Sequence, residues 1–219
     1  MRGPRALAGA LALALPLALS LALPVAAHAQ ATANTLSSRL DPTTRVAVQA
    51  IVDSARRAKL PTAPLIDKAL EGAAKHSDGP NIVSAVRQLS VELGQSKRVL
   101  GGGASTAELQ ASATAMHAGV SSRDIALLRS AAGPHRRVTL PLAVMTDLIG
   151  RNVPVATASQ VVVGLARAGA HDSDLSMFER NVRLDIERGA DPSAAAQTRA
   201  RGVMLRTAPR AGTRPPGNQ

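Results

Sequence analysis

The stretch from Leu140 to Gly189 decides the fold: LPLAVMTDLIGRNVPVATASQVVVGLARAGAHDSDLSMFERNVRLDIERG. It holds three segments in which large apolar residues recur every three or four positions, as Leu175, Phe178 and Val182 do in the last of them. This spacing places apolar side chains on one face of an α-helix. The stretch therefore predicts three helices, each buried on one side.

Glycines and helix-starting residues separate these segments. A glycine adopts the left-handed conformation that follows many helices at no steric cost, and the segments end at Gly150, Gly169 and Gly189. The chain restarts at residues suited to the first turn of a helix, namely Pro154, Asp172 and Asp191-Pro192. The pattern predicts helices joined by short turns.

The same pattern recurs with a period of about 33 residues. When the sequence is aligned with itself so that Val120 or Leu60 matches Val153, the apolar residues that follow also match apolar residues. We interpret three helical hairpins, at residues 60–93, 120–150 and 153–189. Because one hairpin cannot bury its apolar face alone, we expect an all-α array or irregular bundle. Chance agreement among alanine-rich helices is the alternative.

The first 29 residues predict a secretory signal peptide. Arg2 and Arg5 precede an uncharged Ala/Leu run, and Ala27-His28-Ala29 supplies the small residues that signal peptidase requires. An uncleaved membrane anchor is the alternative, but Pro24 and the Ala-x-Ala pattern favour cleavage after Ala29. The chain has no cysteine, so we expect a periplasmic or secreted protein held by its core rather than by disulfides.

The rest of the chain divides into three regions. Residues 30–40 are small and polar and predict a flexible lead-in, and Asp41-Pro42 opens the helical array of residues 41–201. Residues 202–219 are rich in proline, glycine and arginine and predict a disordered basic tail. Within the array, Gly101 to Gly103 mark a joint, and Ser105 to Glu108 form a capping box.

Composition limits the ligands. The chain has no tryptophan or tyrosine and one phenylalanine, so it cannot build aromatic platforms for sugars or bases. After loss of Arg2 and Arg5, 24 basic residues face 15 acidic ones, a net charge of about +9. Five of those arginines lie in the last stretch, which leaves a body of about +4 and predicts an ordinary solvated surface.

Arginines supply the candidate anion-binding residues. Paired guanidinium groups can hold a phosphate or a carboxylate in bidentate fashion, whereas the same residues at a helix end can simply complement the helix dipole. The candidates are the pairs Arg56-Arg57 and Arg136-Arg137, together with Arg206, Arg210 and Arg214 towards the C-terminus.

Three histidines are the candidate metal ligands. His76, His135 and His171 each fall at the turn of a predicted hairpin, with Asp172 beside the last of them. If the hairpins stack in parallel, the three imidazoles line one edge, and imidazole with carboxylate can hold zinc. Neighbouring turns of a helical array lie about 9 Å apart, too far for one ion to be bound by all three. We therefore expect no high-affinity metal site and no cofactor.

Common catalytic and nucleotide-binding motifs are absent from the sequence. We expect an exported, non-enzymatic helical-repeat protein that serves as a binding or scaffold module for another envelope protein or an anionic envelope polymer. The alternative is a metal-binding protein or metal-dependent hydrolase that uses the turn histidines. We expect no sequence-specific binding of nucleic acid and no transmembrane span in the mature chain. The oligomeric state stays open.

Overall fold

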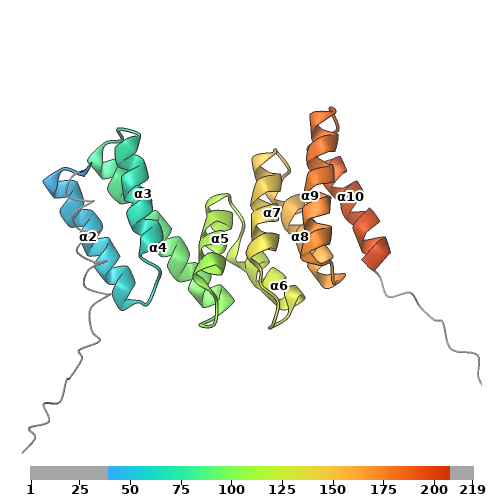
Figure 1. Ribbon diagram of the computed structural model, residues 1–219, viewed down its shortest axis with the longest axis horizontal. Helices are drawn as coiled ribbons and strands as arrows, with labels where there is room; N and C mark the ends of the chain where they lie inside the picture. The colour runs from blue at the N-terminus through green and yellow to red at the C-terminus, as the bar shows by residue number, and fades with distance from the viewer. Residues whose placement is uncertain (1–38, 208–219) are drawn as a thin grey trace, which may run out of the picture.

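The computed structural model describes residues 39–207, and these residues form nine α-helices and no β-strand (Figure 1). The all-α prediction is confirmed for this part of the chain. The predicted signal peptide, most of the lead-in and residues 208–219 lie outside the described residues. The helices are α2 (Pro42–Arg57), α3 (Ala63–Ala74), α4 (Gly79–Leu100), α5 (Thr106–His117), α6 (Ser122–Ala132), α7 (Thr139–Gly150), α8 (Val155–Arg167), α9 (Asp172–Glu187) and α10 (Pro192–Thr207).

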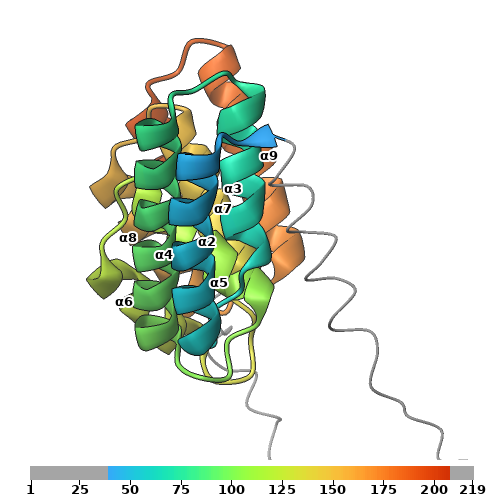
Figure 2. The ribbon, with the colours of Figure 1, turned by 90° about the vertical axis from the view of Figure 1, so that its left-hand side faces the viewer.

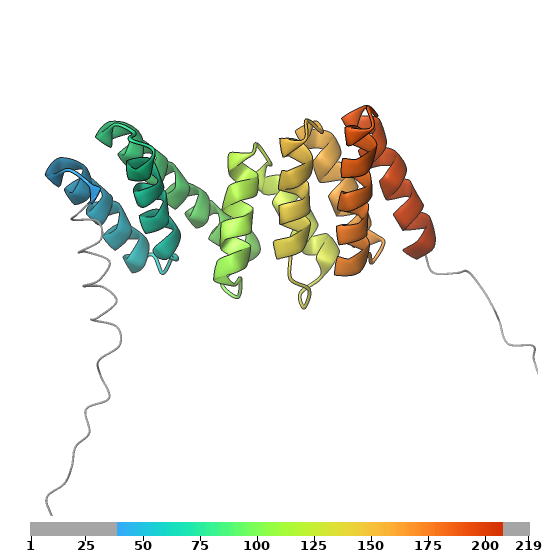
Figure 3. The ribbon, with the colours of Figure 1, turned by 45° about the horizontal axis from the view of Figure 1, so that its top comes forward.

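Consecutive helices run in opposite directions, so that all even-numbered helices point one way and all odd-numbered helices the other (Figure 1). The even-numbered helices pack side by side as one layer from α2 to α10, and α5, α7 and α9 form the second layer (Figure 2). The result is an elongated array of two helical layers (Figure 3). No helix in residues 39–207 has the length and apolar character needed to cross a bilayer.

Six of the connecting turns share one conformation. The residue after each helix C-cap has a positive φ, and the next N–H donates to the carbonyl five residues earlier, as from Ala170 to Leu165 at 3.0 Å and from Val120 to Ala115 at 2.9 Å. This left-handed cap satisfies the last carbonyls of the helix and reverses the chain in a few residues. The positive-φ residues are Lys59, His76, Gly119, Asn152, Gly169 and Gly189.

The predicted stop at Gly150 is wrong, whereas those at Gly169 and Gly189 are confirmed. Gly150 is the last helical residue of α7, and the left-handed position falls on Asn152, with a φ of 65°. Asparagine tolerates this conformation because its short polar side chain can bond locally. The sequence pattern placed the stop at the nearest glycine and overlooked the asparagine.

The core consists of two apolar clusters that meet at α4 and α5. The first contains residues of α2 to α5 such as Val86 and Leu93, and the second extends from α5 to α10 and includes Phe178 and Val182. Leu100, at the end of α4, packs against both. The described residues therefore form one continuous array with a seam between its two cores.

The helices of two predicted hairpins barely contact each other. The hairpin of residues 60–93 packs as expected, because α3 lies along α4. In contrast, α6 packs on α4 and α8, and α7 packs on α5, α8 and α9. The short turns fix the order and direction of the helices. The helices other than α3 then pack on second neighbours in their own layer, and α4 with α5, α7 with α8 and α9 with α10 also pack across the two layers.

Helix α10 extends beyond Arg201, where the sequence predicted its end, and includes residues 202–207 of the predicted tail. Val203 is buried, and Met204 lies over Gly164 of α8, where an added Cβ would come within 2.6 Å of the Met204 Cε atom. The apolar face that anchors α10 to α8 thus continues through Val203, which the arginine-rich surroundings hid from the sequence analysis.

Helix α9 provides a test of the buried stripe with an internal control. Val182 is fully buried, whereas Met177, in the same helix, is 52% exposed. We expect Val182→Asp to lower the free energy of unfolding by about 3–5 kcal/mol, because it leaves a buried charge without a partner. Met177→Asp should change it by less than about 0.5 kcal/mol. Denaturant titrations measure both changes. Equal free energies of unfolding for the two variants would contradict this packing of α9.

Candidate functional site

One long edge of the array is strongly basic. All even-numbered helices end at this edge, and all odd-numbered helices after α2 begin there (Figure 1). We call the helix ends and turns of residues 54–66, 97–109, 129–142, 164–175 and 204–207 the basic edge. It carries ten arginines and lysines against three aspartates and glutamates. The opposite edge carries six arginines and lysines and eight aspartates and glutamates; it consists of residues 39–45, 71–82, 114–125, 147–158 and 184–195.

Basic side chains tie neighbouring helix ends together along the basic edge. Lys97 of α4 donates from Nζ to the carbonyl oxygens of Ala58 and Lys59, at 2.9 and 3.2 Å, where α2 ends. Arg136 donates from Nη2 to the carbonyl oxygen of Ala170 at 2.6 Å, in the turn between α8 and α9. Lys97 also complements the negative end of the α2 dipole, because it binds a carbonyl at the C-terminus of that helix.

The two irregular connections of the array lie next to each other on this edge. After α4 and α6 the chain leaves through Gly101 and Gly133, whose φ values are 86° and 77° with extended ψ, and neither forms the left-handed cap of the other six turns. Between the two loops lies a cleft of about 690 Å³. Its lining includes Leu100, Gly103, Ser105, Glu108, Arg129, His135 and Arg137.

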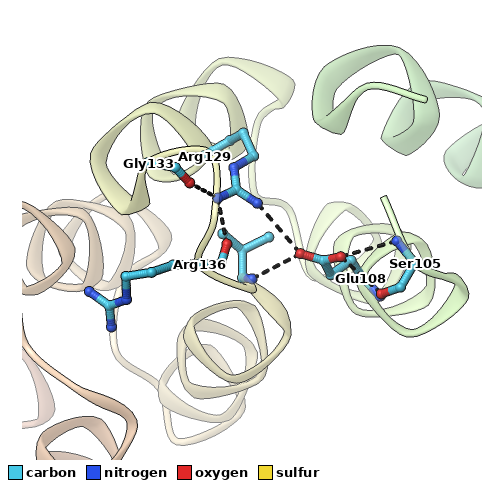
Figure 4. A network of polar contacts seen from close by, with 6 residues as sticks. Ser105, Glu108, Arg129, Gly133 and Arg136 are labelled. Atoms are coloured by element: carbon cyan, nitrogen blue, oxygen red, sulfur yellow. Dashed lines mark hydrogen bonds and ion pairs between the residues drawn. The ribbon is translucent and has the colours of Figure 1, made fainter. Parts of the chain in front are cut away.

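Glu108 holds these two loops together (Figure 4). Its Oε2 atom accepts hydrogen bonds from the backbone N–H of Ser105 at 3.0 Å and from the Ser105 hydroxyl at 2.9 Å, which confirms the predicted capping box. Its Oε1 atom accepts from the backbone N–H of Val138 at 3.1 Å and pairs with Arg129 at 3.5 Å. The side chain of Glu108 is 8% exposed, and each of its two carboxylate oxygens binds one of the two loops.

Arg129 completes this network from α6. Its Nη2 atom donates to the carbonyl oxygens of Gly133 and Arg136, so one guanidinium group fixes both ends of the loop between α6 and α7. The side chain of Arg136 extends away from Arg129 and Glu108, as Figure 4 shows. His135, Arg136 and Arg137 of this loop all line the cleft, and the guanidinium group of Arg136 also binds the next turn along the edge.

The electrostatics of Glu108 favour its charged form. Burial by itself raises the pKa of this carboxyl, but the hydrogen bonds from Ser105 and Val138 and the charge of Arg129 outweigh burial and hold the pKa below its ordinary value of 4.5. Glu108 is thus an ionised clamp whose oxygens are already occupied. In this arrangement it stabilises the loops, as a cap and an ion pair together.

The predicted arginine pairs separate in the structure. Arg56 pairs with Asp53 at 2.5 Å, whereas Arg57 is exposed beside it. Arg136 binds the carbonyl of Ala170, whereas Arg137 is exposed at the cleft. Neither pair presents two free guanidinium groups to a single anion. Arg206 is exposed in the last turn of α10, and Arg210 and Arg214 lie outside the described residues.

The three candidate histidines do not line one edge. His135 and His171 lie at adjacent turns of the basic edge, which the bond from Arg136 to Ala170 joins. His76 lies at the opposite edge, between α3 and α4, because the single helix α5 reverses the direction of the chain between the first predicted hairpin and the second (Figure 1). The expected alignment of all three is wrong.

Local backbone roles account for two of these histidines. His76 occupies the left-handed turn position after α3, and His171 is the N-cap of α9, where its N–H donates to Asp174 at 2.9 Å. Asp172 is the first residue of that helix. In residues 39–207 no three histidine or acidic side chains are grouped closely enough to hold a metal ion.

A second concave surface lies where the odd-numbered layer is open. Helices α3 and α5 barely contact each other, which leaves part of α4 uncovered between them (Figure 3). The groove there measures about 420 Å³, and within it His117 Nδ1 lies 3.3 Å from Glu92 Oε1. Its lining consists of Lys68, Ala85, Gln88, Leu89, Glu92, Thr114 and His117.

Comparison with known proteins adds no family. No protein-family model matches this chain, and no curated protein or solved structure does so either. The functional argument therefore rests on the residues and geometry of the chain itself.

The basic edge is not apparent from the net charge of the body, because that sum hides how the charges divide between the two edges. Every even-numbered helix has an arginine or lysine in its last turn, and among the odd-numbered helices only α5 has a basic residue there, His117. That signal is present in the sequence. The gathering of these basic residues on one edge can be predicted by numbering the expected helices and assuming that consecutive helices run in opposite directions.

Glu108→Gln tests the clamp. The amide presents N–H groups where the carboxylate accepts bonds from both loops, so we expect the free energy of unfolding at neutral pH to fall by about 1–3 kcal/mol. The exposed Glu187 of α9, changed to glutamine, is the matched control and should have little effect.

The pH dependence of stability gives a second measurement on the same variants. Because the pKa of Glu108 is lower in the folded chain, its contribution is complete above the unfolded value near 4.5 and is lost as the pH falls through the folded value. Urea titrations from about pH 6 to pH 3 should show a smaller acid-induced loss in Glu108→Gln than in the wild type. Identical profiles would mean that Glu108 is not a clamp.

Proposed function

We propose that this chain is exported and acts as a non-enzymatic binding module of the bacterial cell envelope, which holds an anionic envelope polymer or an acidic envelope protein on the surface of its helical array. The observation that carries the proposal is the sorting of charge. Ten basic residues against three acidic ones lie on one edge, and six against eight lie on the other. Such a one-sided field attracts and orients an anionic partner.

The architecture supports a binding role. A two-layer helical array offers long faces and edges without needing a closed pocket, and its ends and turns can change without loss of the core. The buried carboxylate of Glu108, which lines the cleft, has both oxygens bound to the two loops and joins them. Export is supported by the leader of residues 1–29, with its charged start, apolar run and Ala-x-Ala site.

Expression of the full chain in a bacterium tests both parts of the proposal. Protein recovered outside the cytoplasm should have the intact mass of residues 30–219, because the leader is removed after Ala29. Immobilised on a resin, it should retain envelope material at low salt and release it at high salt, since salt screens contacts with exposed cations.

A shortened chain ending at Thr207 is the control for the tail. It keeps the basic edge but lacks Arg210 and Arg214, so it should retain less material than the whole chain and still respond to salt. Protein that keeps residues 1–29 would overturn the export part. A resin that retains nothing from envelope extract at any salt concentration would overturn the binding part.

A further inference from the structure

Within the basic edge, some cations are used by the fold and others are free to bind. Lys97, Arg129 and Arg136 donate to backbone carbonyls, and Arg56 pairs with Asp53. The remaining six are exposed, and in residues 39–207 none of them has an acidic side chain within ion-pair distance. These are Arg57, Lys59, Arg98, Arg137, Arg167 and Arg206.

The six exposed cations form a row. Together the ends of α2, α4, α6, α8 and α10 and the turns that follow them carry these residues, and the five helices pack successively in one layer. Packed helix axes lie about 8–10 Å apart, so the row extends over roughly 40 Å with a cationic step at each helix. Because the helices that carry it form a single layer, the row is long and narrow.

We propose that this row binds an extended linear polyanion, whose anionic groups follow the exposed cations from Arg57 to Arg206. The inference rests on the proposed binding function and names the partner that fits its surface. Five of the six cations are arginines. A guanidinium group holds phosphate or carboxylate through two parallel hydrogen bonds, which suits a chain of repeated anionic groups.

An anionic membrane fits this surface less well. Peripheral binding to a bilayer gains much of its strength from apolar side chains that enter the headgroup region beside the cations. In residues 39–207 the exposed large apolar side chains are Val46, Val91, Leu127, Met177 and Leu205. Only Leu205 belongs to the basic edge; the others lie in the middle of helices or towards the opposite edge. A compact acidic protein, in turn, would contact only part of so long a row.

Binding of the mature full chain to long-chain inorganic polyphosphate, to poly-L-glutamate and to vesicles of anionic lipid tests the proposal. The basic-edge variant replaces Arg57, Arg98, Arg137 and Arg167 with glutamine. The control variant also introduces glutamine, at four exposed arginines outside the basic edge: Arg87, Arg123, Arg180 and Arg188. Both variants lose four arginine charges, so they differ only in where the charge is removed.

Titrations over a range of salt concentrations give the decisive quantity. Each lost contact with a polyanion lowers the slope of log K against log salt by about 0.7–0.9, so the basic-edge variant should lose about 3 from this slope. We expect its affinity at low salt to fall by at least about tenfold and that of the control by less than about threefold. Such a difference with either polymer supports the proposal, and the polymer that binds more tightly shows whether phosphate or carboxylate is preferred.

Three results would overturn the inference. The first is an equal loss in both variants, which would indicate attraction to net charge alone. The second is tighter binding to the vesicles than to either polymer. The third is no binding to polymer by a chain that still retains envelope material, which would leave the proposed function standing on another surface, such as the groove between α3 and α5. Circular dichroism checks that both variants fold, and a double variant, Arg98→Gln with Arg137→Gln, serves if the fourfold one does not.

Discussion

The left-handed residue after each of six helices is the constraint on which the rest of the structure depends. The N–H of the residue that follows it donates to the carbonyl five residues earlier, and the chain turns back on itself within a few residues. Because the chain reverses after each helix, two turns lie on the same edge when an even number of helices separates them and on opposite edges when the number is odd. The arginines and lysines gather on one edge for this reason, because the even-numbered helices all end there and carry basic residues in their last turns.

The two connections that depart from this rule are the ones that need a separate clamp. The loops that begin at Gly101 and Gly133 lack the left-handed cap, and Glu108 joins them through both of its carboxylate oxygens. Arg129 then fixes the carbonyls of the second loop. This network lies beside the seam between the two apolar clusters, so it fixes the cleft of the basic edge at the point where the two clusters meet.

Much of the helical structure follows from local sequence, whereas the arrangement of the site does not. Apolar spacing, the capping box at Ser105 and the start at Asp41 are short-range signals, and the structure confirms them. Packing partners depend on which neighbour each stripe meets, which is why the pairing of α6 with α7 was wrong. The three turn histidines would share an edge only if the hairpins stacked in parallel, and α5 prevents this because it reverses the chain between the first hairpin and the second. The basic edge could have been found from the sequence by the same count of helices.

Electron–electron distances between paired spin labels test the central claim, that alternating helices bring the basic turns to one edge. The chain has no cysteine, so labels can be placed at two introduced cysteines without competition. We compare Ala58→Cys with His135→Cys, both on the basic edge, and Ser77→Cys with His135→Cys, on opposite edges. The first pair is farther apart in sequence, yet we predict the shorter distance for it. A shorter distance between positions 77 and 135 would contradict the alternation and, with it, the basic edge.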